Sequence, residues 1–197
     1  VYLHYSADLP DFQQLADYHP PTVTRVQAGD GRLIAEYATE KRIFVPIKAM
    51  PPLMVEAVVA AEDRDFYSHP GVDPEAIIRA EVTNFLHLGS GRRQIGASTI
   101  TQQVARIFLL SNDYSYARKI KEAILAIRLE QALTKDQILE LYLNAPYFGE
   151  GAYGVAGAAL TYFNKSLDEL TVPEAAFIAG VLKGPSYYDP VRHYDRA

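Results

Sequence analysis

The chain has 197 residues, of which 49% are hydrophobic and 22% charged, and its formal net charge is -5. This length predicts one main domain with a sizeable core. The negative charge excludes a globally basic surface, so nucleic acid is not expected as a partner, and the lack of cysteine excludes disulfides and thiolate metal sites.

A β-hairpin is expected near the N-terminus. Two β-prone runs, residues 22–26 and 32–36, flank the turn-forming sequence Ala-Gly-Asp-Gly of residues 28–31. We predict that this hairpin is the only β structure. Residues 1–45 are interpreted as a lead-in with the hairpin, and residues 46–197 as one helical domain.

Helical patterns with clear start and stop signals fill the rest of the chain. Two prolines start a helix whose residues 53–61 are apolar on all sides, which predicts that it is buried. Thr134 with Gln137, and Thr171 with Glu174, have the spacing of capping boxes at the starts of two later helices. The predicted helices cover residues 53–61, 73–88, 99–110, 116–133 and 134–144 and begin again at 171, with a closely packed Gly/Ala-rich segment over 149–163.

The first buried helix ends at two carboxylates, Glu62 and Asp63. The C-terminal end of a helix carries partial negative charge, so carboxylates are electrostatically misplaced there. The helix dipole and the apolar neighbours should favour the neutral form of Glu62, which suits a general base. The alternative is an ordinary ion-pair cluster with Arg64 or Arg79. His69, followed by Pro-Gly, is interpreted as a turn residue with a satisfied imidazole rather than as a base or ligand.

Small hydroxyl residues open the helix that begins within residues 96–103. The free amides and the positive dipole end of such a helix start can bind an anion such as diphosphate. Thr99 and Gln102 also have the spacing of a plain capping box, which is the structural alternative for the same segment.

Charged residues Arg118, Lys119 and Glu122 lie in the longest predicted helix. Apolar residues line both of its faces: Ile120, Ile124 and Ile127 on one, and Leu125 and Leu129 on the face shared by Arg118 and Glu122. We therefore expect both faces to be covered and the Arg118–Glu122 pair to lie in a partly enclosed cleft. The alternative is a surface pair worth only about 0.2 to 0.5 kcal/mol.

Taken in order, five segments resemble the conserved blocks of the family 51 peptidoglycan glycosyltransferases, and the preceding hairpin is typical of class A penicillin-binding proteins. The resemblance covers roughly residues 46–190. The matching segments are Glu62–Gly71, Gly96–Gln103, Arg118–Glu122, Lys135–Asn144 and Gly151–Lys165.

The resemblance implies a mainly α fold, with a lysozyme-like lobe and a smaller jaw lobe facing the membrane. Glu62 then matches the glutamate that deprotonates the acceptor 4-hydroxyl, which attacks C1 of the donor sugar of lipid II as undecaprenyl diphosphate leaves. Glu122 matches the assisting glutamate. Asp63 would position the acceptor or a divalent cation, Mg²⁺ or Mn²⁺, and the resemblance leaves this metal open and implies no other cofactor. The implied diphosphate-binding residues are Ser98, Thr99, Gln102, Gln103, Arg106, Arg118 and Lys119.

The implied partners are lipid II, the growing glycan chain, the membrane surface, the inhibitor moenomycin and a transpeptidase domain of the same polypeptide. The implied location is the outer face of the bacterial cytoplasmic membrane. No apolar run approaches the roughly 20 residues of a membrane span. Because the chain starts at Val1 without a methionine, we expect its anchor to lie outside this piece.

The sequence departs from the family pattern at a few positions and leaves two other functions open. The departures are Ala97 for a second glycine, Arg106 for lysine, Tyr114-Ser115 for a basic residue and threonine, and Asn164 for glycine. One alternative function is a lysozyme-like lytic glycoside hydrolase or lytic transglycosylase, but cleaving a glycosidic bond needs no cationic diphosphate clamp. The other is a non-catalytic membrane or partner-binding module that uses residues 107–110 and Arg92-Arg93.

Overall fold

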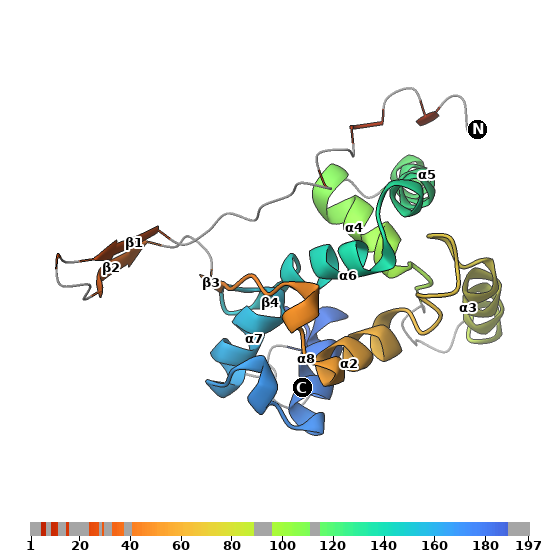
Figure 1. Ribbon diagram of the computed structural model, residues 1–197. Helices are drawn as coiled ribbons and strands as arrows, with labels where there is room; N and C mark the ends of the chain where they lie inside the picture. The colour runs from red at the N-terminus through yellow and green to blue at the C-terminus, as the bar shows by residue number, and fades with distance from the viewer. Residues whose placement is uncertain are drawn as a thin grey trace. The chain divides into compact units, whose positions relative to one another are not determined.

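The computed structural model describes residues 5–6, 9–11, 15, 24–27, 29, 33–37, 41–88, 96–110 and 115–188 (Figure 1). Arg92, Arg93 and Tyr114, named above, lie outside these residues. The chain forms two compact units, Val1–Ala16 with Glu62–Leu139 and Asp17–Ala61 with Glu140–Ala197. The predicted division between residues 45 and 46 stays a prediction. The fold is mainly helical, as expected.

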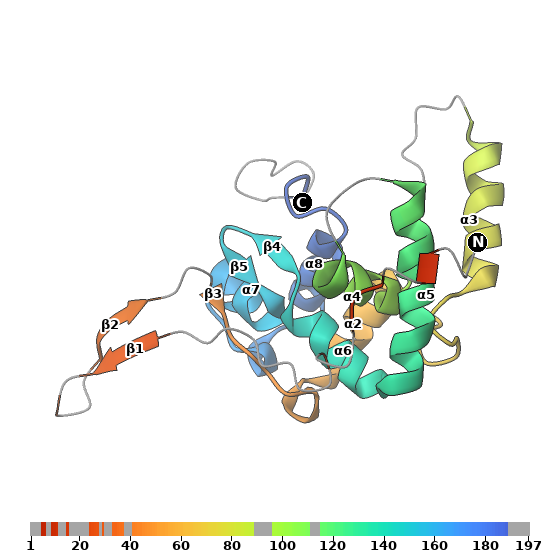
Figure 2. The same cartoon turned by 90° about the horizontal axis from the view of Figure 1, so that it is seen from above.

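The first unit contains the helices α3 (Pro74–Leu86), α4 (Ile100–Leu109) and α5 (Tyr116–Ala132), and α6 (Lys135–Asn144) begins in it. The side chain of Asp73 caps α3 by accepting a hydrogen bond from the amide of Ala76. Helix α4 packs against α5 and crosses it rather than running beside it (Figure 2). The buried residues of these helices include Val104 and Ala105 of α4 and Leu125 and Leu129 of α5. The predicted helix boundaries agree with the structure to within one or two residues.

The second unit contains the predicted hairpin, made of β1 (Thr24–Gln27) and β2 (Leu33–Tyr37), with Thr24 paired to Tyr37. It also contains a second sheet, in the order β3-β5-β4, so the prediction of a single β structure is wrong. Its strands are β3 (Lys41–Arg42), β4 (Tyr147–Gly149) and β5 (Ala152–Tyr153). Strands of two or three residues are too short to show an alternating pattern in the sequence.

The described residues of the second unit form three α-helices, α2 (Pro52–Glu62), α7 (Gly154–Phe163) and α8 (Val172–Leu182), and two short 3₁₀ helices, η2 (Ile47–Ala49) and η3 (Leu167–Glu169). The last residue of α2, Glu62, is counted with the first unit. In α2 only Met54 and Val58 are buried, so the prediction of burial on all sides is wrong. The alanines and valines of this helix made it look apolar all round, but one i, i+4 stripe carries its contacts.

Close packing of the Gly/Ala-rich segment is confirmed. Residues 154–159 of α7 are all buried. Gly154 has φ +73°, and a Cβ atom there would lie 2.9 Å from the carbonyl oxygen of Asn144, so only glycine fits. Asn164 ends α7 in the left-handed conformation, with φ 52°. Asparagine tolerates this conformation better than most residues, which explains how it replaces a glycine here.

Candidate active site

Glu62 lies at the C-terminal end of α2, where it is half-buried. Its Oε2 accepts a 2.8 Å hydrogen bond from the side-chain amide of Gln103, and Gln103 Oε1 lies 3.5 Å from a guanidinium nitrogen of Arg106. The side-chain amide of Gln103 thereby fixes the position of one carboxylate oxygen of Glu62.

The predicted alternative for this region is an ion-pair cluster with arginine. Among the described residues, Arg64 and Arg79 form no ion pair with Glu62. The alternative of an ion-pair cluster also included Asp63, whose carboxylate pairs with His69. An arginine cluster is therefore not what the structure shows.

A hollow of about 240 Å³ opens beside Glu62. It lies between the residues that follow α2, the first turns of α3 and the loop of residues 96–99. Its polar lining includes Asp65, Arg79, Thr83 and Ser98. The predicted general base therefore faces a space that can receive a substrate group.

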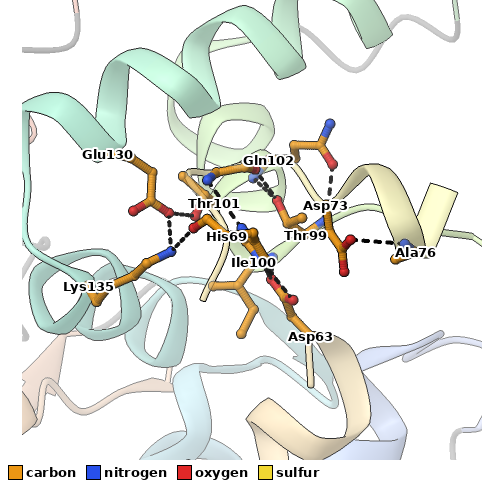
Figure 3. Close-up of polar contacts among 11 residues, drawn as sticks. Asp63, His69, Asp73, Ala76, Thr99, Ile100, Thr101, Gln102, Glu130 and Lys135 are labelled. Carbon is orange, nitrogen blue, oxygen red and sulfur yellow. Dashed lines mark hydrogen bonds and ion pairs between the residues drawn. The ribbon is translucent and has the colours of Figure 1, made fainter. Parts of the chain in front are cut away.

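Asp63, which also lines this hollow, forms a buried pair with His69 (Figure 3). His69 Nε2 lies 3.0 Å from both carboxylate oxygens of Asp63, and the amide of Gly71 donates to His69 Nδ1 at 3.1 Å. Because Nδ1 accepts this hydrogen bond, the proton lies on Nε2 and is donated to Asp63. The interpretation of His69 as a turn residue with a satisfied imidazole is confirmed. Gly71 has φ +95°, and a Cβ there would lie 2.7 Å from the carbonyl oxygen of Ala126 in α5.

The same Asp63 carboxylate holds the start of α4, because its Oδ2 also accepts a 2.9 Å hydrogen bond from the amide of Ile100. Both carboxylate oxygens therefore have partners within the protein. Within the described residues there is no group of three His, Cys, Asp or Glu side chains placed to hold a metal ion. A substrate or metal contact of Asp63 stays a prediction.

Thr99 and Gln102 form the capping box that was the structural alternative for this segment. The Gln102 amide donates to Thr99 Oγ1 at 3.1 Å, and the Thr99 amide donates to Gln102 Oε1 at 3.0 Å. Thr99 Oγ1 also donates to the carbonyl of Gly71 at 2.6 Å. The amides of Ile100 and Gln102 therefore donate to acceptors within the protein. An anion at this helix start would have to be bound mainly by nearby side chains. Substrate contacts of Thr99 and Gln102 stay predictions.

A second charged cluster lies on α5. Lys119 Nζ is 2.6 Å from Glu122 Oε2 and 2.7 Å from Ser98 Oγ, and Arg118 Nε is 3.3 Å from Glu122 Oε1. The side chains of Glu122 and Arg118 are 1% and 9% exposed, whereas that of Lys119 is 46% exposed. The predicted enclosure of this pair is confirmed. Two cations flank one buried carboxylate, so the cluster has an excess positive charge that can attract an anion.

A third polar cluster was not predicted from the sequence. Lys135 Nζ lies 2.7 Å from both Glu130 Oε1 and the carbonyl oxygen of His69 (Figure 3). The same nitrogen lies 4.5 Å from the ring centre of Phe66. Thr101 Oγ1 donates to the same Glu130 oxygen at 2.6 Å. This cluster ties α4, α5 and the start of α6 to the turn that carries His69. The only sequence signal was that Lys135 begins the fourth family-like block.

The sequence comparison establishes the family to which the chain belongs. The family model described as Transglycosylase matches residues 30–197, and the chain belongs to this family. The resemblance to family 51 glycosyltransferases is thereby confirmed.

Particular relatives are penicillin-binding proteins 1A. The protein of that name from Rickettsia conorii is 56% identical over 100% of this chain and 25% of its own length, and that from Escherichia coli K12 is 49% identical over 100% of this chain and 23% of its own length. The chain therefore spans about a quarter of these relatives. A crystal structure of penicillin-binding protein 1A from Haemophilus influenzae is 26% identical, with 91% of this chain and 17% of that chain covered and a TM-score of 0.43, which is too low to support a conclusion about the fold.

Proposed function

We propose that the chain is the peptidoglycan glycosyltransferase part of a class A penicillin-binding protein and polymerises lipid II into β-1,4-linked glycan strands, with release of undecaprenyl diphosphate. The observation that carries this proposal is the α5 cluster, in which Lys119 joins Ser98 to the buried Glu122. Excess positive charge beside a cleft suits a diphosphate leaving group, and such charge stabilisation is usually the largest catalytic contribution.

Glu62 acts as the general base. It takes the proton from the 4-hydroxyl of the acceptor sugar as that oxygen attacks C1 of the donor, and the C1–phosphate bond breaks with its electrons going to the diphosphate. A diphosphate leaves as a stable anion, so no acid is needed to protonate it. Attack opposite the leaving group inverts C1 from an α-linked donor to a β-linked product.

The other residues hold this arrangement. Gln103 orients the Glu62 carboxylate through its 2.8 Å hydrogen bond. Glu122 keeps Lys119 and Arg118 fixed at the cleft, so we assign it a positioning role. We assign no Mg²⁺ or Mn²⁺ to Asp63, because both carboxylate oxygens of Asp63 accept hydrogen bonds within the protein.

The wider setting follows from family membership and from the chain's share of its relatives. We propose a lysozyme-like lobe with a smaller jaw lobe, moenomycin as an inhibitor, and a transpeptidase domain and membrane anchor elsewhere in the polypeptide, in the envelope at the outer face of the cytoplasmic membrane. In the described part of the chain, no helix is long and apolar enough to span a membrane.

The test is glycan synthesis from labelled lipid II, with and without moenomycin, alongside digestion of purified, lipid-free sacculi. We expect glycan from lipid II and no soluble fragments from sacculi. Glu62→Gln should abolish synthesis with the fold intact, since an amide cannot take the proton. Glu56→Gln, an exposed change on the same helix, is the control and should be active. Fragments from sacculi with lipid II untouched would instead support the lytic alternative.

A further inference from the structure

A closed ring of polar contacts joins α4, α5 and the start of α6 to the turn that carries His69 (Figure 3). Thr101 Oγ1 and Lys135 Nζ both donate to the same Glu130 oxygen, at 2.6 and 2.7 Å. Lys135 also donates to the carbonyl of His69 at 2.7 Å. We call this arrangement the polar ring, and its members in chain order are Asp63, His69, Ile100, Thr101, Glu130 and Lys135.

The other side of the polar ring carries the residues that place Glu62. The Asp63 carboxylate accepts hydrogen bonds from His69 at 3.0 Å and from the amide of Ile100 at 2.9 Å. Asp63 directly follows Glu62 in the chain. On α4, three residues beyond Ile100, Gln103 donates to the Glu62 carboxylate at 2.8 Å. The proposed base is therefore attached to the ring twice, through its own backbone and through the helix that carries its hydrogen-bond donor.

The members of the ring that come from α4, α5 and α6 are mostly buried. Thr101 is fully buried, and the side chains of Glu130 and Lys135 are 10% and 22% exposed. Hydrogen bonds with little access to water hold their partners firmly. None of these three described side chains lines the hollow beside Glu62. Any effect they have on a reaction in that hollow must therefore reach the substrate through Glu62.

Helix α5 is not held equally on all sides. Ile127 is 44% exposed, so the prediction that both faces of this helix are covered is wrong for the described residues. Elsewhere on α5, Glu130 belongs to the polar ring, and the carbonyl of Ala126 lies too close to Gly71 to leave room for a Cβ there. These contacts help to determine where α5 lies relative to the turn that carries His69.

We propose that Thr101, Glu130 and Lys135 are positioning residues, which hold the proposed base against its amide donor on α4. Their effect on turnover rests on the proposed function, whereas the placement itself can be measured without substrate. Misplacing a catalytic group by about 1 Å can cost about 100-fold in rate. A ring that only stabilised the fold would lower activity in proportion to unfolding. A positioning ring lowers the rate of the chemical step even in fully folded protein.

The placement is measured by NMR, from the side-chain amide signal of Gln103 in the isotope-labelled chain. Gln103→Ala assigns this signal by its loss, and Glu62→Ala gives the signal position when the Glu62 acceptor is removed. Thr101→Val removes the ring hydroxyl with little change of shape, and it should move the Gln103 signal toward its position in Glu62→Ala. Thr101→Ser keeps a hydroxyl and should leave the signal at its wild-type position.

The effect on turnover is measured as initial rates of glycan synthesis over a range of lipid II concentrations, at a temperature where each variant is folded. Thr101→Val should lower kcat at least about tenfold and leave KM unchanged, because the lining of the hollow is untouched. Lys135→Met combined with Glu130→Gln breaks the ring without leaving an uncompensated buried charge. This double variant should be more stable than Lys135→Met alone, yet its kcat should stay at least about tenfold low. Lys183→Met, at an exposed lysine, is the control and should match the wild type.

Three results would overturn the proposal: a Gln103 signal that stays at its wild-type position in the ring variants, a wild-type kcat in a folded ring variant, or a loss confined to KM. If Thr101→Val does not fold, the double variant provides both measurements. The fate of the proposed function is separate. If the signal moves as expected but the wild-type chain never extends lipid II, only the proposed function fails. If the wild type is active and the signal does not respond to breaking the ring, only the positioning role fails.

Discussion

The capping-box motif occurs at the starts of both α4 and α8, but the two copies are connected to the rest of the protein differently. At α4, Thr99 and Gln102 are buried, and Thr99 also bonds the carbonyl of Gly71, 28 residues away. At α8, Thr171 is exposed and its partner Glu174 is half-buried. The motif therefore predicts a helix start equally well in both places. Only the α4 copy is part of a buried network next to a proposed catalytic base.

The largest effect is expected at the residue that connects the α4 cap to the His69 turn. Asp63→Asn would present an amide donor to the Nε2 proton of His69 and remove the charge that the Ile100 amide contacts. A buried polar group left without its partner costs about 1 to 3 kcal/mol, and we expect about 3 here together with loss of synthesis. Urea unfolding measures this effect, with the exposed Asp65→Asn as the stability control. An Asp63→Asn variant as stable as the wild type would remove the contrast between the two caps.

The second effect concerns Lys135, which joins the α4 side of the network to α6. Lys135→Met leaves the largely buried Glu130 carboxylate without its cation, and we expect a loss of about 2 kcal/mol. Adding Glu130→Gln should recover part of this loss, because the uncompensated charge is then gone. Lys183→Met, an exposed lysine, is the control. Fully additive effects of the two substitutions would show that the pair does not act as a unit.

The third effect compares the two caps directly. Thr99→Val removes an N-cap hydroxyl that also bonds Gly71, and we expect a loss of about 1 to 2 kcal/mol. Thr171→Val should cost less, because water can replace its hydroxyl. Thermal unfolding of both variants decides the order. A larger loss at Thr171 would mean that burial of the α4 cap adds nothing to its stability.

The same contrast explains what the sequence could and could not predict. Local signals placed the helix starts correctly, because a capping box such as Thr99 with Gln102 is complete within four residues. The burial of Glu122 followed from helical periodicity and is confirmed. The Lys135–Glu130–Thr101 cluster was missed because its members come from three helices, and no local pattern records such contacts.

Two errors have the same cause. In the β3-β5-β4 sheet, β3 pairs residues 41–42 with residues 152–153 of β5, which are more than 100 positions away in the chain, although β4 and β5 themselves are close in sequence. The apolar face of α5 carries isoleucines that suit a core, but Ile127 lines a groove. Periodicity identifies an apolar face without showing what packs against it.

The smallest expected effect is a pH dependence that only the α8 cap should show. The hydrogen bond from Lys165 and the amide of Thr171 lower the pKa of Glu174 from 4.5 to about 2. The folded state therefore holds this proton less tightly than the unfolded state, and the stabilisation is fully present above about pH 4.5 and lost as the pH falls through about 2. Urea unfolding from pH 6 to pH 2 should show a wild-type advantage over Glu174→Gln that shrinks toward zero in this window. Glu56→Gln, at an exposed position, controls for the substitution itself. The α4 cap cannot contribute such a trend, because Gln102 does not titrate. A wild-type advantage that grew on acidification would contradict the lowered pKa of Glu174. Because water screens the partly exposed Lys165–Glu174 pair, we expect this effect to be the smallest of the four.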